Sequence, residues 1–236
     1  MTNILAIDTS TDACSVALYR DGQYSEIYEI TPRQHSQKIF SMLRELLPTG
    51  KLREQGIDAV AYACGPGSFT GLRIAASAVQ GLAFSNKLPV LGVSTLACQA
   101  QTALREAVAT TESLVLSMLD ARINEVYWAL YDFRGGLACE LQGPAVCAPQ
   151  DVSFARSQER IVGVGGGLIY VQSLPETVQL ALTKTAVGLM PRARDLIPLA
   201  LADYESGRWQ TPTQVAPVYV REKVSWKKIS EQGKRS

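Results

Sequence analysis

The residues best suited to chemistry in this chain are the glycines and hydroxyls of one loop, Gly-Pro-Gly-Ser-Phe-Thr-Gly-Leu-Arg at 65–73. Glycine lets backbone N–H groups approach a ligand closely, and the first turn of a helix adds unpaired N–H groups and a positive dipole end. The loop therefore predicts an anion or phosphate site, and a tight strand-to-helix turn without a ligand is the alternative. The candidate phosphate contacts are Gly65, Gly67, Ser68 and Thr70.

A second polar turn follows the apolar segment 4–7 and contains Asp8, Thr9, Ser10 and Thr11. A carboxylate beside several hydroxyls can hold a hydrated Mg²⁺ and a phosphate. The same residue types also make ordinary turns. Because two such motifs are more specific than either alone, we interpret them together as a candidate nucleotide site.

The single histidine, His35, argues against a dedicated metal centre. Two imidazoles on one helical face would bind a metal, but the position one turn after His35 is Ile39. The 5 cysteines include no C-x-x-C pair, and Cys14 and Cys64 fall in apolar segments. We therefore expect no transition-metal site, reduced core thiols, and His35 either on the surface at a helix start or in a subunit contact.

These candidate residues must be positioned by two similar halves of the chain. The first half predicts three antiparallel strands up to residue 30, helices over 36–47 and 70–84, strands over 58–64 and 89–93, and a helix ending near 108. The second half predicts strands over 114–119, 125–133, 137–141 and 161–164, a short helix over 149–157, and a helix opened by glycines 165–167. Two βββαβα halves predict a duplicated, two-lobed α/β fold with ligand binding between the lobes.

The domain boundaries follow from this repeat. We place the first lobe at 1–108, the second lobe at 109–189 and a C-terminal segment at 207–236, and expect a helix over 190–206 to pack back on the first lobe. The start of the chain lacks a cationic flank, and no segment approaches the roughly 18 apolar residues of a membrane span. We therefore expect a cytoplasmic protein with no membrane contact.

Four motifs resemble those of the bacterial TsaB (YeaZ) proteins. They are Ile-Asp-Thr-Ser at 7–10, the loop at 65–73, Asp-Ala-Arg at 120–122 followed by Glu-Val-Tyr at 125–127, and Pro-Val-Tyr-Val-Arg at 217–221. The resemblance spans almost the whole chain. It implies an actin/Hsp70/sugar-kinase (ASKHA, RNase H-like) fold and a role in making threonylcarbamoyladenosine at adenosine 37 of transfer RNA.

The resemblance also implies partners and cofactors. The chain would be a non-catalytic scaffold or activator of a catalytic paralogue, TsaD, in a complex that also uses a TsaE-type ATPase and binds tRNA. ATP and Mg²⁺ would be used by the complex, whereas this chain would need no cofactor of its own and would bind nucleotide weakly or not at all. In isolation it would form a homodimer.

The predicted helix over 71–84 is nearly free of charge, with Arg73 as its only ionised residue. Such a helix is buried on more than one side, either by its own domain or by helices of a partner. In the family that the chain resembles, the first two long helices of this lobe form the contact with TsaD, which favours an interface. The candidate interface residues are His35, Ile39, Met42, Leu43, Leu72, Arg73, Ala75, Ala76 and Val79.

The second half departs from what a phosphotransferase needs. The turn at 120–124 has no glycine, and its Arg122 could reach a phosphate or pair with Asp120 or Glu125, of which we favour the pairing. Gly166, in the later glycine turn, is a further candidate nucleotide contact. The alternative function is a Mg-ATP-dependent small-molecule kinase using Asp8, and the single histidine disfavours a metalloprotease.

The end of the chain, from 221 to 236, is rich in lysine and arginine, although the net charge of the whole chain is only +1. A frayed terminus is one interpretation. A tRNA-binding or partner-binding arm, with Trp226 stacking on a base, is the other.

Overall fold

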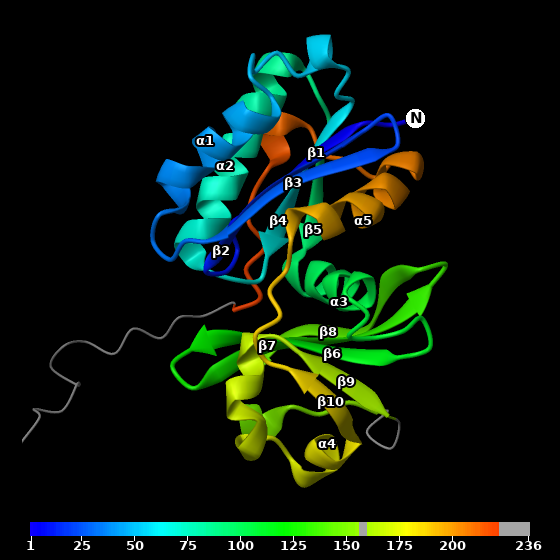
Figure 1. The fold of residues 1–236 in the computed structure, drawn as a ribbon. Coiled ribbons are helices and arrows are strands. Elements are labelled where there is room, and N and C mark those ends of the chain that lie inside the picture. Colours follow the sequence, from blue (N-terminus) through cyan, green and yellow to red (C-terminus); the bar gives the residue numbers. More distant parts are fainter. Residues whose placement is uncertain (156–159, 222–236) are drawn as a thin grey trace, which may run out of the picture.

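The computed structural model describes residues 1–155 and 160–221, and the predicted tail interaction of Trp226 lies outside the described residues. The described chain forms two lobes, each built on a five-stranded sheet (Figure 1). The first sheet contains β1 (Ile4–Asp8), β2 (Ala13–Arg20), β3 (Gln23–Ile30), β4 (Ala59–Gly65) and β5 (Val90–Ser94). The second contains β6 (Leu114–Arg122), β7 (Glu125–Arg134), β8 (Leu137–Cys147), β9 (Ile161–Val164) and β10 (Leu182–Ala186).

The two sheets share one topology, in the spatial orders β3-β2-β1-β4-β5 and β8-β7-β6-β9-β10. In each sheet an antiparallel meander of three strands continues into parallel strands. The predicted duplicated α/β fold is therefore confirmed. Because β1 and β4 are parallel, their carboxyl ends meet at one edge of the sheet, which brings Asp8 close to the loop after Gly65.

Helices cover both faces of the first sheet. They are α1 (His35–Leu46), α2 (Phe69–Asn86), α3 (Thr95–Arg105) and α5 (Ala193–Glu205). The side chains of α1 and α2 pack on one face in a core that includes Ile39 and Val79. The side chains of α5 pack on the other face, where Leu196 and Ile197 are fully buried. The helix that completes the first lobe thus comes from a part of the sequence that follows the second lobe.

Several element boundaries differ from those predicted. The helix predicted over 190–206 begins only at Ala193, and the short helix predicted over 149–157 is a 3-10 turn, Pro149–Asp151. The glycine turn opens a 3-10 helix, Gly166–Ser173, followed by the short α4 (Glu176–Ala181) and by β10. Among residues 1–155 and 160–221, no helix has the length and apolar character needed to cross a membrane.

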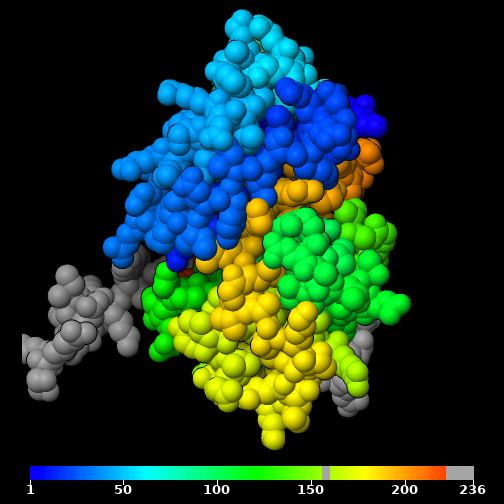
Figure 2. All heavy atoms as spheres, in the orientation of Figure 1, coloured from blue at the N-terminus to red at the C-terminus, as the bar shows by residue number. Residues whose placement is uncertain are grey.

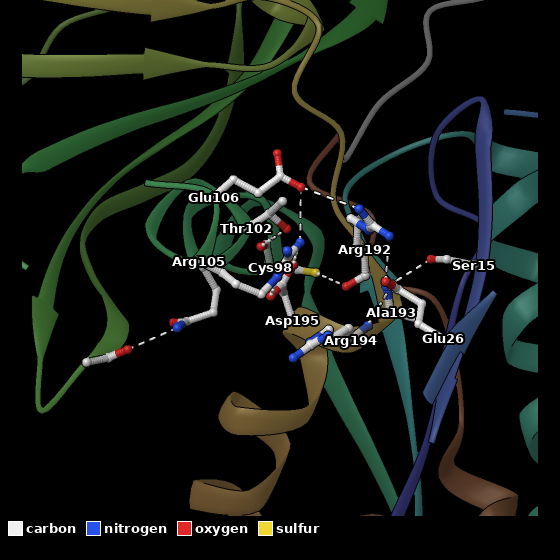
Figure 3. Close-up of polar contacts among 12 residues, drawn as sticks. Ser15, Glu26, Cys98, Thr102, Arg105, Glu106, Arg192, Ala193, Arg194 and Asp195 are labelled. Atoms are coloured by element: carbon white, nitrogen blue, oxygen red, sulfur yellow. Dashed lines mark hydrogen bonds and ion pairs between the residues drawn. The ribbon is translucent and has the colours of Figure 1, made fainter. Parts of the chain in front are cut away.

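The two lobes meet at α3, which contacts β4 of the first sheet and β6, β7 and β8 of the second. The segment that leads into α5 lies in the seam between the lobes in the space-filling view (Figure 2). Ion pairs fix α5 and the segment before it within the first lobe: Arg105 Nε of α3 lies 2.7 Å from Asp195 Oδ1, and Arg192 lies 2.6 Å from Glu26 Oε2 of β3 (Figure 3). Arg192 also reaches Glu106, at the end of α3, over 3.5 Å.

Candidate functional site at the Gly65 loop and the α1/α2 groove

The loop after β4 is closed by hydrogen bonds within the chain. Its Ser68 caps α2, because Ser68 Oγ accepts from the N–H of Gly71 over 3.3 Å. The N–H of Ser68 donates to the carbonyl oxygen of Ser10 over 2.7 Å, and the N–H of Leu72 donates to the carbonyl oxygen of Ser68. Three of the donors that the sequence offered to an anion, the N–H groups of Ser68, Gly71 and Leu72, therefore already have acceptors within the chain.

The glycines of the loop serve the packing of the two polar turns on each other. A Cβ added at Gly67 would lie 2.5 Å from the carbonyl oxygen of Ser10, and one at Gly71 would lie 1.9 Å from that of Thr9. Thr9 Oγ1 also donates to the carbonyl oxygen of Gly71 over 2.7 Å. The structure thus brings together the two turns singled out in the sequence, and glycine is required there for contact between backbones.

Asp8 is enclosed beneath this contact, with 2% of its surface exposed. Its Oδ1 accepts from the N–H of Ser10 over 2.7 Å, whereas its Oδ2 has no hydrogen-bond partner among the described residues. Burial raises the pKa of the Asp8 carboxyl to about 6. Thr9 and Ser10 are also buried, and Thr11 is half-buried. A carboxylate in this position does not face a hydrated Mg²⁺.

The other side of the loop is covered by the C-terminal segment. The N–H of Val218 donates to the carbonyl oxygen of Cys64 over 2.7 Å, and a Cβ added at Gly65 would lie 2.5 Å from the carbonyl oxygen of Val218. Of the four predicted phosphate contacts in the loop, Ser68 and Thr70 are exposed, whereas Gly65 is buried. Because Asp8 and Gly65 are both enclosed, the residues present do not fit a Mg²⁺ and phosphate held between the two turns.

The corresponding turn of the second lobe is held by Arg122, as favoured from the sequence. The N–H of Arg122 donates to Asp120 Oδ1 over 2.8 Å, and its guanidinium lies 3.2 Å from Asp120 Oδ2. Arg122, Ile123 and Asn124 all adopt left-handed backbone conformations, with φ of 64°, 54° and 57°. Gly166 lies elsewhere in this lobe, half-buried, with open space where a Cβ would be.

An open groove lies between α1 and α2, beside the closed loop. It has a volume of about 500 Å³, and a smaller hollow of about 230 Å³ lies further along the same helices. Phe40 lines both, and 54% of its surface is exposed, as is 58% of Phe69 at the start of α2. The groove is lined by Ser36, Phe40, Phe69, Thr70, Arg73, Ile74, Ser77 and Ala78.

The structure corrects the side chains that the sequence assigned to a partner contact. All except Arg73 are buried within the chain's own lobe, because the apolar faces of α1 and α2 pack on the first sheet. His35 is a buried residue and not a surface one, and its Nε2 donates to the carbonyl oxygen of Ala13 over 3.2 Å. The buried members of the predicted set are His35, Ile39, Met42, Leu43, Leu72, Ala75, Ala76 and Val79.

Sequence reasoning did not assign Phe40 or Phe69 to the groove, although the position of each relative to the apolar face of its helix could have indicated it. Phe40 follows the buried Ile39 directly, so it points away from the apolar face of its helix. Phe69 likewise precedes the apolar positions of α2. An aromatic side chain off the buried face indicates a surface with a use beyond the chain's own core.

Metal-ligating side chains form no candidate metal site in the described part of the chain. Among residues 1–155 and 160–221, no three or more His, Cys, Asp or Glu side chains lie close enough together to hold a metal ion. The 5 cysteines are free thiols. Burial raises the pKa of Cys14 to about 12 and that of Cys64 to about 11, so both are poor nucleophiles near neutral pH.

Comparison with known proteins identifies relatives along almost the whole chain. The model of the family TsaD, tRNA N6-adenosine threonylcarbamoyltransferase, matches residues 26–190. The tRNA threonylcarbamoyladenosine biosynthesis protein TsaB of Escherichia coli K12 is 41% identical over 229 residues, covering 96% of this chain and 97% of that protein. The protein of the same name from Haemophilus influenzae is 34% identical, covering 96% of each.

A solved structure, YeaZ from Pseudomonas aeruginosa, matches this one with a TM-score of 0.84 and 40% identity, covering 93% of this chain and 100% of that chain. The two-lobed actin-like fold expected from the sequence motifs is therefore confirmed. Together with the curated relatives, this agreement in sequence and fold shows that the chain belongs to the TsaB (YeaZ) family.

Proposed function

We propose that this chain acts in tRNA threonylcarbamoyladenosine biosynthesis as a non-catalytic subunit, docked through the α1/α2 groove on a catalytic paralogue of the TsaD type. The observation that carries the proposal is the contrast between two neighbouring surfaces. The loop that would hold a phosphate is closed by the Ser68–Ser10 hydrogen bond, while the groove beside it is open and exposes Phe40 and Phe69.

The closed loop supports a role without chemistry in this chain. A phosphoryl transfer site needs donors and a metal ligand aimed at the substrate. Here the N–H groups of Ser68 and Leu72 bind backbone oxygens, and Asp8 is buried with its pKa raised to about 6. We propose accordingly that the chain needs no cofactor of its own and that ATP and Mg²⁺ are used elsewhere in the complex.

The groove supports the choice of partner. The family model that matches this chain is named for TsaD, so a paralogue of that type is expected to carry helices equivalent to α1 and α2. Two such helix pairs can pack face to face around a pseudo-twofold axis. The outward positions Ser77 and Gly81 of α2 are small and permit a close approach. The same surface would form a homodimer when the paralogue is absent.

Other members of the proposed complex follow from the family. A TsaE-type ATPase and the tRNA would be bound through the complex, and the protein would work in the cytoplasm. The net charge of +1 supports this division of labour, because the chain as a whole offers little attraction to the tRNA backbone.

The test is reconstitution of tRNA modification with the TsaD-type paralogue and the other components, with and without this chain. We expect modification only when this chain is present, and we expect the Asp8→Asn variant, which lacks the carboxylate that Mg²⁺ would need, to support it fully. Loss of modification by Asp8→Asn with unchanged binding to the paralogue would contradict the proposal. Phosphoryl transfer from Mg-ATP by this chain alone would also contradict it. The purified chain is therefore assayed for phosphoryl transfer, and its binding of Mg-ATP is measured by isothermal titration.

A further inference from the structure

The segment after α5 runs the length of the first lobe along its surface. It begins as an added strand, because Gln210 and Val90 exchange backbone hydrogen bonds of 2.8 and 2.9 Å. Further along, the buried Tyr62 donates its hydroxyl to the carbonyl oxygen of Ala216 over 3.0 Å. Val215 packs against the core beneath α1 and α2. The segment is therefore held to the first lobe by both backbone and side-chain contacts.

The segment then crosses to the second lobe. After the Val218–Cys64 hydrogen bond beside the Gly65 loop, it reaches the hairpin between β6 and β7. There the guanidinium of Arg221 donates to the carbonyl oxygen of Ala121 over 3.1 Å and forms an ion pair with Glu125. Of the two side chains in this pair, 20% of Arg221 and 38% of Glu125 are exposed. The crossing thus ends in a charge-assisted contact that solvent can reach.

One side chain of the crossing also belongs to the α1/α2 groove surface. The rings of Tyr219 and Phe69 lie with their centroids 5.8 Å apart. The guanidinium of Arg73 lies 3.4 Å from the centre of the Phe69 ring and 5.8 Å from that of Tyr219. Phe69 and Arg73 both line the groove. A molecule that docks in the groove against these two side chains therefore reaches the direct neighbours of Tyr219.

We propose that residues 215–221 form a latch that holds the β6–β7 hairpin of the second lobe to the first lobe, and that docking in the α1/α2 groove shifts this latch through the Phe69–Arg73–Tyr219 cluster. The coupling rests on the proposed function, since it takes the TsaD-type paralogue as the docked partner. The latch itself rests only on contacts within this chain.

The energetics of the contacts suit a latch that opens and closes. An ion pair as exposed as Arg221–Glu125 contributes modestly to stability, and local opening of such a segment is easier than global unfolding. The contact of α3 with the second sheet is different, because it is a buried apolar core that includes Leu96, Ala100 and Val115. The lobes are therefore joined firmly at α3 and weakly at the latch, which makes the latch the point at which their spacing can change.

The latch is tested by hydrogen exchange of the full chain, comparing wild type with Arg221→Gln, Glu125→Gln and the double variant. We expect exchange in residues 120–126 and 215–221 to rise about two- to fivefold in each single variant, and no further in the double variant. Arg208→Gln, which breaks the exposed Arg208–Asp203 pair on α5, is the matched control and should leave both segments unchanged. Unaltered exchange of the hairpin in the Arg221 variant would overturn the latch.

The coupling is tested by repeating the measurement with the TsaD-type paralogue bound. We expect binding to change exchange in residues 120–126 of the wild type and to leave it unchanged in Tyr219→Ala. If the paralogue binds and the hairpin does not respond in the wild type, the coupling is wrong and the proposed function stands. If the paralogue does not bind the wild type at all, the proposed function and the coupling are both wrong. The latch is then decided by hydrogen exchange of the Arg221 and Glu125 variants alone.

Discussion

The N–H of Ser68 donates to the carbonyl oxygen of Ser10 over 2.7 Å, and this bond ties the loop after β4 to the turn after β1. The two residues are far apart in sequence, and each belongs to a turn that the sequence predicted as part of a phosphate site. Because this bond and the Thr9–Gly71 bond join the two turns, the turns pack against each other at the edge of the first sheet. Glycine is what allows the two backbones to come this close.

Gly71→Ala should therefore be costly. The new Cβ would lie 1.9 Å from the carbonyl oxygen of Thr9, so the two turns must move apart. We expect the free energy of unfolding in urea to fall by about 3 kcal/mol. Gly81→Ala, in the same helix with nothing within 4 Å of the new Cβ, should instead raise it by about 0.5–1 kcal/mol. Similar effects for both variants would contradict the close contact.

Asp8 should make stability depend on pH. Burial raises the pKa of its carboxyl to about 6 in the folded chain from the ordinary 3.8, so between these values the folded state binds more protons than the unfolded state. Stability then falls as pH rises from about 4 to about 6 and is level above that, with a total loss on the order of 3 kcal/mol.

The check is the free energy of unfolding of wild type and Asp8→Asn, measured from pH 4 to pH 8. The free energy of unfolding of Asp8→Asn should not fall with pH in this way. Its difference from the wild-type value should therefore grow by about 3 kcal/mol across this range. A difference that stays constant with pH would show that Asp8 titrates as an exposed carboxyl does.

The two aspartates of α5 allow a matched test of the buried ion pair that joins α3 and α5. Asp195 is 3% exposed and pairs with Arg105 over 2.7 Å, and this hydrogen bond raises the pKa of Arg105. Asp203 is 34% exposed and pairs with Arg208 over the same distance. Asp195→Ala should lower the free energy of unfolding by about 2–3 kcal/mol, because it removes the buried partner of Arg105 and leaves only the more exposed Glu106.

Asp203→Ala should lower the free energy of unfolding by less than about 0.5 kcal/mol, since water screens the Arg208–Asp203 pair. Chemical denaturation of both variants at neutral pH measures the contrast. Equal losses would mean that the Arg105–Asp195 pair contributes no more than an ordinary surface pair.

Phe40→Glu tests the groove as a docking surface. A carboxylate placed between α1 and α2 would have to be buried in the interface, so affinity for the TsaD-type paralogue should fall at least about tenfold. Ile169→Glu, at a 59% exposed position of the second lobe, is the control and should bind as the wild type does. The melting temperatures of both variants should match the wild type, and equal affinity of the two variants would place the contact elsewhere.

The helix starts and the repeat of the fold could be predicted from sequence because their signals are local. The start of α2 was predicted at Thr70 and lies at Phe69, where Ser68 provides the cap. The exception is β10, which the pattern did not indicate. It is a short edge strand with Lys184 among polar neighbours, and it is held by pairing with β9 and not by an apolar run.

The site was harder to predict because its defining contacts join distant parts of the chain. The low charge of α2 predicted burial on more than one side, whereas the structure buries one face and leaves positions such as Ser77 and Gly81 exposed. Periodicity also does not say whether Val79 meets the chain's own sheet or another protein. Likewise, no local pattern shows that the backbone of Val218 covers Gly65. Enclosure of Asp8 by these contacts is a property of the assembled lobe.

The late position of α5 in the sequence affects the order of folding during synthesis. Strands β1 to β5 leave the ribosome first, yet the face of their sheet that Leu196, Ile197 and Ala200 cover stays bare until most of the chain has been translated. The second sheet needs only residues 114–186, which are continuous. The apolar face of the first sheet is therefore exposed to aggregation while the second half is made. We expect chaperones to protect this face until α5 has been synthesised.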